Sequence, residues 1–305
     1  MRAILPFFAA AVLCAQEDQP LFKAGANIVR VDVQVEEYGQ ILRGLSGSDF
    51  IIFDENRQQT ITHFAHDIEP LSLILLLDIS GSMTKSIDAV SRASRQALAN
   101  LRPGDKVAVM LFARSSKVTQ DFTSDFEAVS RQIGSAVGDK TLGSATLLNH
   151  AIVAAAKHFE DTAPVGRRAI LIVTDNLGLN HELNDEQVLK KLHSANAVMN
   201  AIVTGRAKRP EADTKARYTN PDFSPSNVFL LSDETGGEAF RPERVDAALG
   251  SIFEKIRRRY ALEYSALSDG KPGAYHHIRV TLSPLGERKY PKAQLRARKG
   301  YYAAE

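Results

Sequence analysis

Three oxygen-bearing side chains follow an apolar run in the stretch LSLILLLDISGSM, residues 71–83. Asp78, Ser80 and Ser82 are spaced two apart, directly after the apolar residues. The run is too continuously apolar to leave a solvent face, which is typical of a central parallel strand covered on both sides. In an open parallel sheet, functional residues gather just past the carboxyl ends of the strands. We therefore expect these three side chains to lie at a functional edge.

Two further oxygen-bearing residues are predicted to meet them there. Asp175 ends a second apolar segment, RRAILIVTDN, and Thr146 stands in GSATLLNHAI at the start of a predicted helix. All five side chains offer oxygen and none offers a soft ligand. Hard oxygen donors with only two formal charges suit an octahedral Mg²⁺ that keeps some of its waters, or Mn²⁺.

An alternation of strands and helices must position these residues. Buried or alternating segments predict strands at 71–79, 105–113, 116–123, 167–176 and 198–205. Apolar residues at helical spacing predict helices at 86–101, 124–133, 146–159, 184–197 and 245–260, and residues 206–227 are polar and predict a long surface loop. Such alternation is typical of a mostly parallel sheet with helices on both faces.

Both ends of the chain are rich in predicted strands. Residues 27–69 open with NIVRVDVQVEEYG, in which Val29, Val31, Val33 and Val35 share one face. Short alternating segments return beyond Tyr260. Terminal strands can pair only if the chain returns, so we expect the α/β unit to be inserted in a β-sandwich-like domain.

The predicted division of the chain has four parts. Residues 1–15 form a secretory signal, 16–69 and 261–305 are the halves of the β-domain, and 70–260 form the α/β domain. The signal has a positive start at Arg2, an apolar stretch and predicted cleavage after Ala15. Acylation of Cys14, as in a lipoprotein, is the less favoured alternative because Leu13 is not small. After cleavage no transmembrane segment is expected.

Composition and motifs exclude several function classes. A net charge of only +2 argues against a nucleic-acid binder. Zinc is not expected, because the chain has one cysteine and its histidine pairs, such as His276 and His277, diverge on predicted strands. Arg296 and Arg298 alternate with apolar residues, which predicts a solvated strand face. No G-x-S-x-G, P-loop or H-E-x-x-H motif is present, so an enzyme is not expected.

The stretch DISGSM fits the D-x-S-x-S signature of the von Willebrand factor type A (VWA) domain. VAVMLFA, the threonine loop and VTDN follow in the order of that family. The resemblance covers roughly residues 70–260. With the flanking pieces VRVDVQV…DFIIFDE and RRYALEYSA…RARKGYYA, the mature chain resembles the VWFA-related family first catalogued in acidobacteria.

This resemblance implies a Rossmann-like sheet carrying a metal-ion-dependent adhesion site. It implies that Ser80, Ser82 and Thr146 are direct or near-direct ligands, and that Asp78 and Asp175 act mostly through bound water. A carboxylate of a partner protein would complete the coordination. The family commonly has glycine after the last aspartate, where this chain has Asn176. Asparagine tolerates a left-handed backbone better than most residues.

These observations together favour a secreted or periplasmic binding protein that engages an acidic group on a protein partner through Mg²⁺ or Mn²⁺. Two alternatives stay open. One is a hydrolase that uses the same metal as a Lewis acid. The other is a structural envelope protein with a degenerate metal site.

Overall fold

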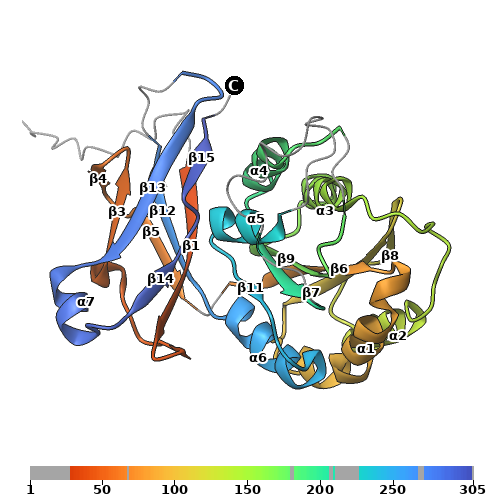
Figure 1. The fold of residues 1–305 in the computed structure, drawn as a ribbon. Helices are drawn as coiled ribbons and strands as arrows, with labels where there is room; N and C mark the ends of the chain where they lie inside the picture. The colour runs from red at the N-terminus through yellow and green to blue at the C-terminus, as the bar shows by residue number, and fades with distance from the viewer. Residues whose placement is uncertain are drawn as a thin grey trace, which may run out of the picture.

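The computed structural model describes residues 28–66, 69–178, 182–205, 209, 227–266 and 271–303. The predicted signal segment and most of the predicted 206–227 loop lie outside these residues. Figure 1 shows two parts side by side, an α/β unit and a β-sandwich. Within the described part of the chain, none of the helices has the length and apolar character needed to cross a membrane.

A six-stranded sheet forms the centre of the α/β unit, with the strand order β11-β10-β9-β6-β7-β8. Its neighbours pair in parallel except β7 and β8, which are antiparallel. The strands are β6 (Leu71–Asp78), β7 (Lys106–Phe112), β8 (Ser116–Thr123), β9 (Arg167–Thr174), β10 (Ala197–Val203) and β11 (Ala239–Phe240).

Helices cover both faces of this sheet (Figure 1). One face carries α1 (Thr84–Leu98), α2 (Phe126–Ser135) and α6 (Val245–Arg257), and the other carries α3 (Leu148–Thr162), α4 (Asp185–Ser194) and α5 (Val228–Thr235). Strand β6 serves both cores: Leu73 and Leu75 pack under the first group, and Ile74 and Leu76 under the second. This two-sided burial is why the sequence of β6 has no polar face.

Local signals place several helix starts. Asp125 accepts a hydrogen bond from the backbone N–H of Ala128 at the start of α2. Asn184 and Gln187 form a capping box at the start of α4. Side-chain capping satisfies backbone donors that a helix start leaves unpaired, so these short polar residues fix where the helices begin.

The β-sandwich consists of two antiparallel sheets that combine strands from both ends of the chain. One sheet has the order β14-β1-β12-β5, with β2 also on β1, and the other has the order β15-β13-β3-β4. The strands are β1 (Ile28–Glu37), β2 (Gln40–Ile41), β3 (Phe50–Asp54), β4 (Arg57–Gln59), β5 (His63–His66), β12 (Tyr260–Ser265), β13 (Tyr275–Leu282), β14 (Gln294–Arg296) and β15 (Gly300–Tyr302). A short helix, α7 (Pro284–Lys289), follows β13.

The core of the sandwich lies between these sheets. The four valines of β1 are buried there as predicted, and they pack with residues of β3, β12 and β13. A parallel-stranded unit with helices on both faces, joined to antiparallel sheets, confirms the predicted α/β fold class.

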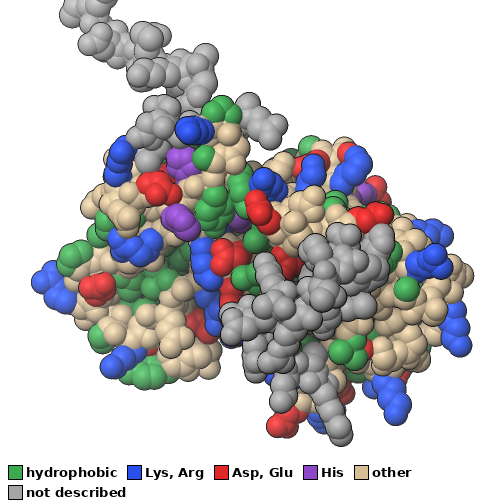
Figure 2. Space-filling model, turned by 45° about the horizontal axis from the view of Figure 1, so that its top comes forward, with side chains coloured by type: hydrophobic (Ala, Val, Ile, Leu, Met, Phe, Trp, Pro, Cys, Tyr) green, Lys and Arg blue, Asp and Glu red, His purple; other side chains and the backbone are tan. Residues whose placement is uncertain are grey.

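Buried arginines connect the two parts, and here one prediction was wrong. Arg298 does not lie on a solvated face: it is buried and donates hydrogen bonds to the carbonyl of Arg30 in the sandwich and to Oδ1 of Asn196 in the α/β unit. Its length lets it span the junction, which a pattern of alternation could not reveal. Figure 2 shows charged side chains of both signs along this boundary, where Lys299 pairs with Glu234 at 3.1 Å.

Candidate metal centre

Asp78 ends β6 and is fully buried at the carboxyl edge of the sheet. Its Oδ1 accepts a hydrogen bond from the backbone N–H of Ser80 at 3.0 Å, and its Oδ2 accepts one from Oγ1 of Thr174 at 2.7 Å. Thr174 is the last residue of the neighbouring strand β9. The carboxylate is therefore held by groups from two adjacent strand ends, with its orientation fixed.

The two serines lie on the turn that leaves β6. Ser80 precedes a single 3₁₀ turn, η2 (Gly81–Met83), which leads into α1. The hydroxyl oxygens of Ser80 and Ser82 are 3.4 Å apart, and Oγ of Ser82 donates a hydrogen bond to Oδ2 of Asp175 at 2.7 Å. Ser80 is buried next to Asp78, and Ser82 is exposed. The two serines therefore connect the buried carboxylate of Asp78 with the surface.

Asp175 and Asn176 form the turn after β9. Asn176 has a φ of +56°, the left-handed conformation that glycine adopts easily and asparagine tolerates. Asn176 therefore adopts the left-handed backbone that asparagine was expected to tolerate. Oδ1 of Asn176 also accepts a hydrogen bond from the backbone N–H of Val228 at 3.3 Å, which links the turn to the start of α5. Glycine could not make that link.

Thr146 lies in the loop before α3, and the helix begins at Leu148 rather than at Thr146 as predicted. The loop is held by its backbone: the N–H of Leu147 donates to the carbonyl of Ala113 at 2.9 Å. Ala113 directly follows Phe112, which is in register with Asp78 on the adjacent strand. Thr146 is thus brought to the same edge and is half-buried there.

The five predicted residues consequently fall into two groups. Hydrogen bonds connect Asp78, Ser80, Ser82 and Asp175, with Thr174 as an additional member that the sequence reasoning missed. Thr146 is positioned by its loop and not by a hydrogen bond that joins it to this group. The only sequence feature that could have indicated Thr174 as a member of this group is its position directly before Asp175 in VTDN.

The electrostatics of the group favour a bound cation. Burial raises the pKa of the Asp78 carboxyl, the hydrogen bonds from Ser80 and Thr174 oppose that rise, and the nearby Asp175 carboxylate adds to it. Two like charges held close in a buried position repel each other, and a divalent cation between them would relieve this repulsion. The donors are hydroxyl and carboxylate oxygens alone, which fits Mg²⁺ or Mn²⁺.

Comparison with known proteins identifies the family that this region resembles. Residues 73–178 match the family model of the von Willebrand factor type A domain. This region is a VWA domain. The match begins inside β6 and ends just after Asn176, so it includes all five candidate ligands.

One curated relative of the chain is distant in sequence. A protein of Borreliella burgdorferi described as uncharacterized is 22% identical over 178 residues, which are 54% of this chain and 52% of that protein. The match thus spans about half the length of this curated relative.

Solved structures with a similar fold include two bacterial proteins. An aerotolerance-related membrane protein from Bacteroides fragilis is 19% identical, with a TM-score of 0.46 over 61% of this chain and 98% of that one. A von Willebrand factor type A protein from Catenulispora acidiphila is 12% identical, with a TM-score of 0.45 over 93% of this chain and 75% of that one.

Proposed function

We propose that this chain is a binding protein whose VWA domain holds Mg²⁺ or Mn²⁺ and, through it, an acidic side chain of a protein partner. The observation that supports this most directly is the connected group of Asp78, Ser80, Ser82 and Asp175 at the edge of the sheet. Its oxygens come from two strand ends that are far apart in the sequence and adjacent in space.

The roles of the residues follow from their contacts. Both oxygens of Asp78 are already engaged by protein donors, which suits an aspartate that contacts the ion through water. The hydroxyls of Ser80, Ser82 and Thr146 are neutral donors that hold the ion without cancelling its charge. A divalent cation held in this way supplies an electrophilic position that attracts an external carboxylate.

Binding is proposed in preference to catalysis. A hydrolase that used the same ion would need a general base beside it to activate water. The carboxylates of the group are occupied, Asp78 by Ser80 and Thr174, and Asp175 by Ser82 and by the backbone N–H of Leu177. We also propose a secreted or periplasmic location, which depends on the sequence of residues 1–15.

Metal titration of the purified chain tests the proposal. Calorimetry and thermal melts with Mg²⁺, Mn²⁺ and EDTA are compared for the parent, Asp78→Asn and Asp161→Asn. A ligand that binds only the folded state raises the melting temperature. We expect that rise in the parent and in Asp161→Asn, whose carboxylate is exposed on α3, and its loss in Asp78→Asn. Equal affinity in Asp78→Asn and the parent would refute the ligand set.

A sensor surface that presents glutamate-containing peptides tests the partner chemistry separately. The parent should bind to this surface in Mg²⁺ and be released by EDTA. The Asp78→Asn variant should not bind in either condition. If the parent binds the metal but does not bind the glutamate-containing peptides at any peptide density, the proposed recognition of an acidic partner is wrong and only the metal binding remains.

A further inference from the structure

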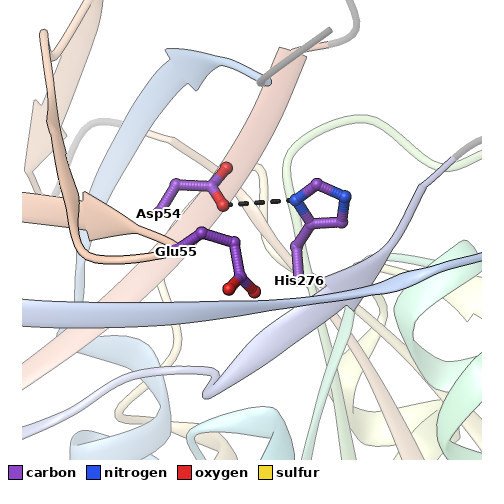
Figure 3. Close-up of side chains that lie close together, drawn as sticks. All are labelled: Asp54, Glu55 and His276. Atoms are coloured by element: carbon purple, nitrogen blue, oxygen red, sulfur yellow. Dashed lines mark hydrogen bonds and ion pairs between the residues drawn. The ribbon is translucent and has the colours of Figure 1, made fainter. Parts of the chain in front are cut away.

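A second group of ligand-type side chains lies in the β-sandwich, apart from the VWA domain. Asp54 ends β3, Glu55 follows it in the turn to β4, and His276 lies on the paired strand β13. Figure 3 shows Asp54 and His276 facing each other with the Glu55 carboxylate beside them, and one potential ligand atom from each residue lies within 4.8 Å of the others.

Hydrogen bonds hold one oxygen of the Asp54 carboxylate, so that the other oxygen could bind an ion. Its Oδ2 accepts hydrogen bonds from the hydroxyls of Tyr264 at 3.0 Å and Tyr301 at 2.9 Å. The carboxylate is fully buried, and because both tyrosines hold Oδ2, Oδ1 is directed at His276.

The distance between Asp54 and His276 suits two ligands of one ion. Oδ1 of Asp54 and Nδ1 of His276 are 3.4 Å apart and form a long hydrogen bond. A charged N–H···O hydrogen bond is usually about 2.7–2.9 Å long. Two ligands bound to zinc at about 2.0–2.1 Å with tetrahedral angles are roughly 3.3–3.4 Å apart. The imidazole is buried and stacks on Tyr301 with ring centroids 5.0 Å apart, which fixes its direction.

Glu55 adds the third donor from the solvent side. It is exposed, and its Oε1 accepts a hydrogen bond from the backbone N–H of His277 at 2.7 Å. This bond holds the carboxylate over β13, next to His276, and leaves Oε2 available. Because Glu55 is exposed and the other two residues are buried, an ion can enter from this side and keep a water as its fourth ligand.

We propose that Asp54, Glu55 and His276 bind Zn²⁺, with water in the fourth position. One imidazole and two carboxylates form a borderline donor set that suits zinc better than Mg²⁺, and two carboxylates with a neutral imidazole balance a divalent charge. The bound ion fastens the β3–β4 turn to β13, and so joins strands from the two ends of the chain. The zinc site does not depend on the function proposed for the VWA domain.

We test this site by measuring the zinc content and the thermal stability of the chain. All variants carry Asp78→Ala, which removes the candidate metal centre of the VWA domain. The chain is dialysed against Zn²⁺, its metal is quantified, and zinc affinity is measured by calorimetry. The variants are His276→Phe, which retains the stacking on Tyr301, and Glu55→Gln, which changes an exposed residue and retains an acceptor for His277. His277→Ala is the matched control, since this neighbouring histidine is exposed.

We expect one zinc per chain in the Asp78→Ala parent and in His277→Ala, together with a rise in melting temperature. His276→Phe and Glu55→Gln should lose the bound zinc, and Tyr301→Phe should weaken it about 10- to 100-fold by releasing the Asp54 carboxylate. A Co²⁺-loaded sample should show the strong visible absorption of a tetrahedral site. Unchanged zinc affinity in both His276→Phe and Glu55→Gln would overturn the proposal.

Discussion

The hydroxyl of Ser82 donates a 2.7 Å hydrogen bond to the carboxylate of Asp175, although 93 positions separate the two residues. The contact exists because β6 and β9 are adjacent parallel strands whose carboxyl ends meet. An exposed serine and a buried aspartate thus face each other at the surface of the candidate metal centre. An ion that binds there would have to replace the hydrogen bond between these two oxygens with its own contacts to them.

The substitution Ser82→Ala tests the serine as a ligand. Without metal, we expect the free energy of unfolding to fall by only about 1 kcal/mol, because one hydrogen bond is lost. Affinity for Mg²⁺ should fall by at least about tenfold, since even outer partners of metal ligands contribute that much. Urea denaturation in EDTA and calorimetry with Mg²⁺ measure the two effects. Ser86→Ala, one turn along α1, should leave both unchanged.

Thr146 offers a test that separates a ligand from a loop residue. Its loop is positioned by backbone hydrogen bonds at Leu147, so the threonine side chain is not needed to hold the loop. Thr146→Ser keeps the hydroxyl and should retain the metal affinity of the parent, whereas Thr146→Ala should lower it at least about tenfold. Calorimetry with Mn²⁺ compares the variants. Equal affinities in serine and alanine variants would remove Thr146 from the ligand set.

Much of this centre could be predicted from the sequence because its positions follow from strand topology. An apolar run that ends in an aspartate fixes both the strand and the edge at which its side chain emerges, as for Asp78 and Asp175. The start of α3 could not be placed in the same way: the loop before it is set by a backbone contact with Ala113, which no local pattern encodes.

The junction and the second ligand group were hidden for a related reason. Arg298 is buried between the two parts of the chain, and alternation along one strand carries no information about a neighbouring domain. Asp54 and His276 are 222 positions apart and meet only because β3 pairs with β13. Scanning for closely spaced histidines could not find a site whose ligands come from opposite ends of the chain.

Asp105 provides a stability test at the opposite end of the sheet. This fully buried carboxylate accepts hydrogen bonds from the backbone N–H of Leu71 at 2.7 Å and from Nε of Arg257 at 2.8 Å. Removing one partner of a buried ion pair takes away its hydrogen bonds and much of the compensation of the other charge, which usually costs about 3–5 kcal/mol. We expect Asp105→Ala to lower the free energy of unfolding by this amount, as measured by urea denaturation in EDTA.

The control for this prediction is Asp121→Ala, which removes an exposed carboxylate from β8. Its side chain contacts His158 at the surface, where ion pairs contribute about 0–1 kcal/mol. A loss for Asp105→Ala no larger than that for Asp121→Ala would show that the start of β6 and the end of α6 do not depend on the buried pair.

His193, at the junction, predicts how stability depends on pH. Burial, and then the nearby charge of Arg298, lower the pKa of this histidine from 6.5 to about 3. The unfolded chain therefore binds a proton below pH 6.5 that the folded chain does not bind until about pH 3. Acid favours the form that binds more protons, so His193 makes the free energy of unfolding decrease as the pH falls through this window.

Urea denaturation at a series of pH values in EDTA measures this contribution. Between about pH 6 and 4, the parent should lose up to about 1.4 kcal/mol per pH unit more than His193→Gln, because one proton is involved. The exposed His277→Gln should keep the slope of the parent. If His193→Gln and the parent have the same slope, then His193 takes up its proton in the folded chain, and water reaches the junction between the VWA domain and the β-sandwich.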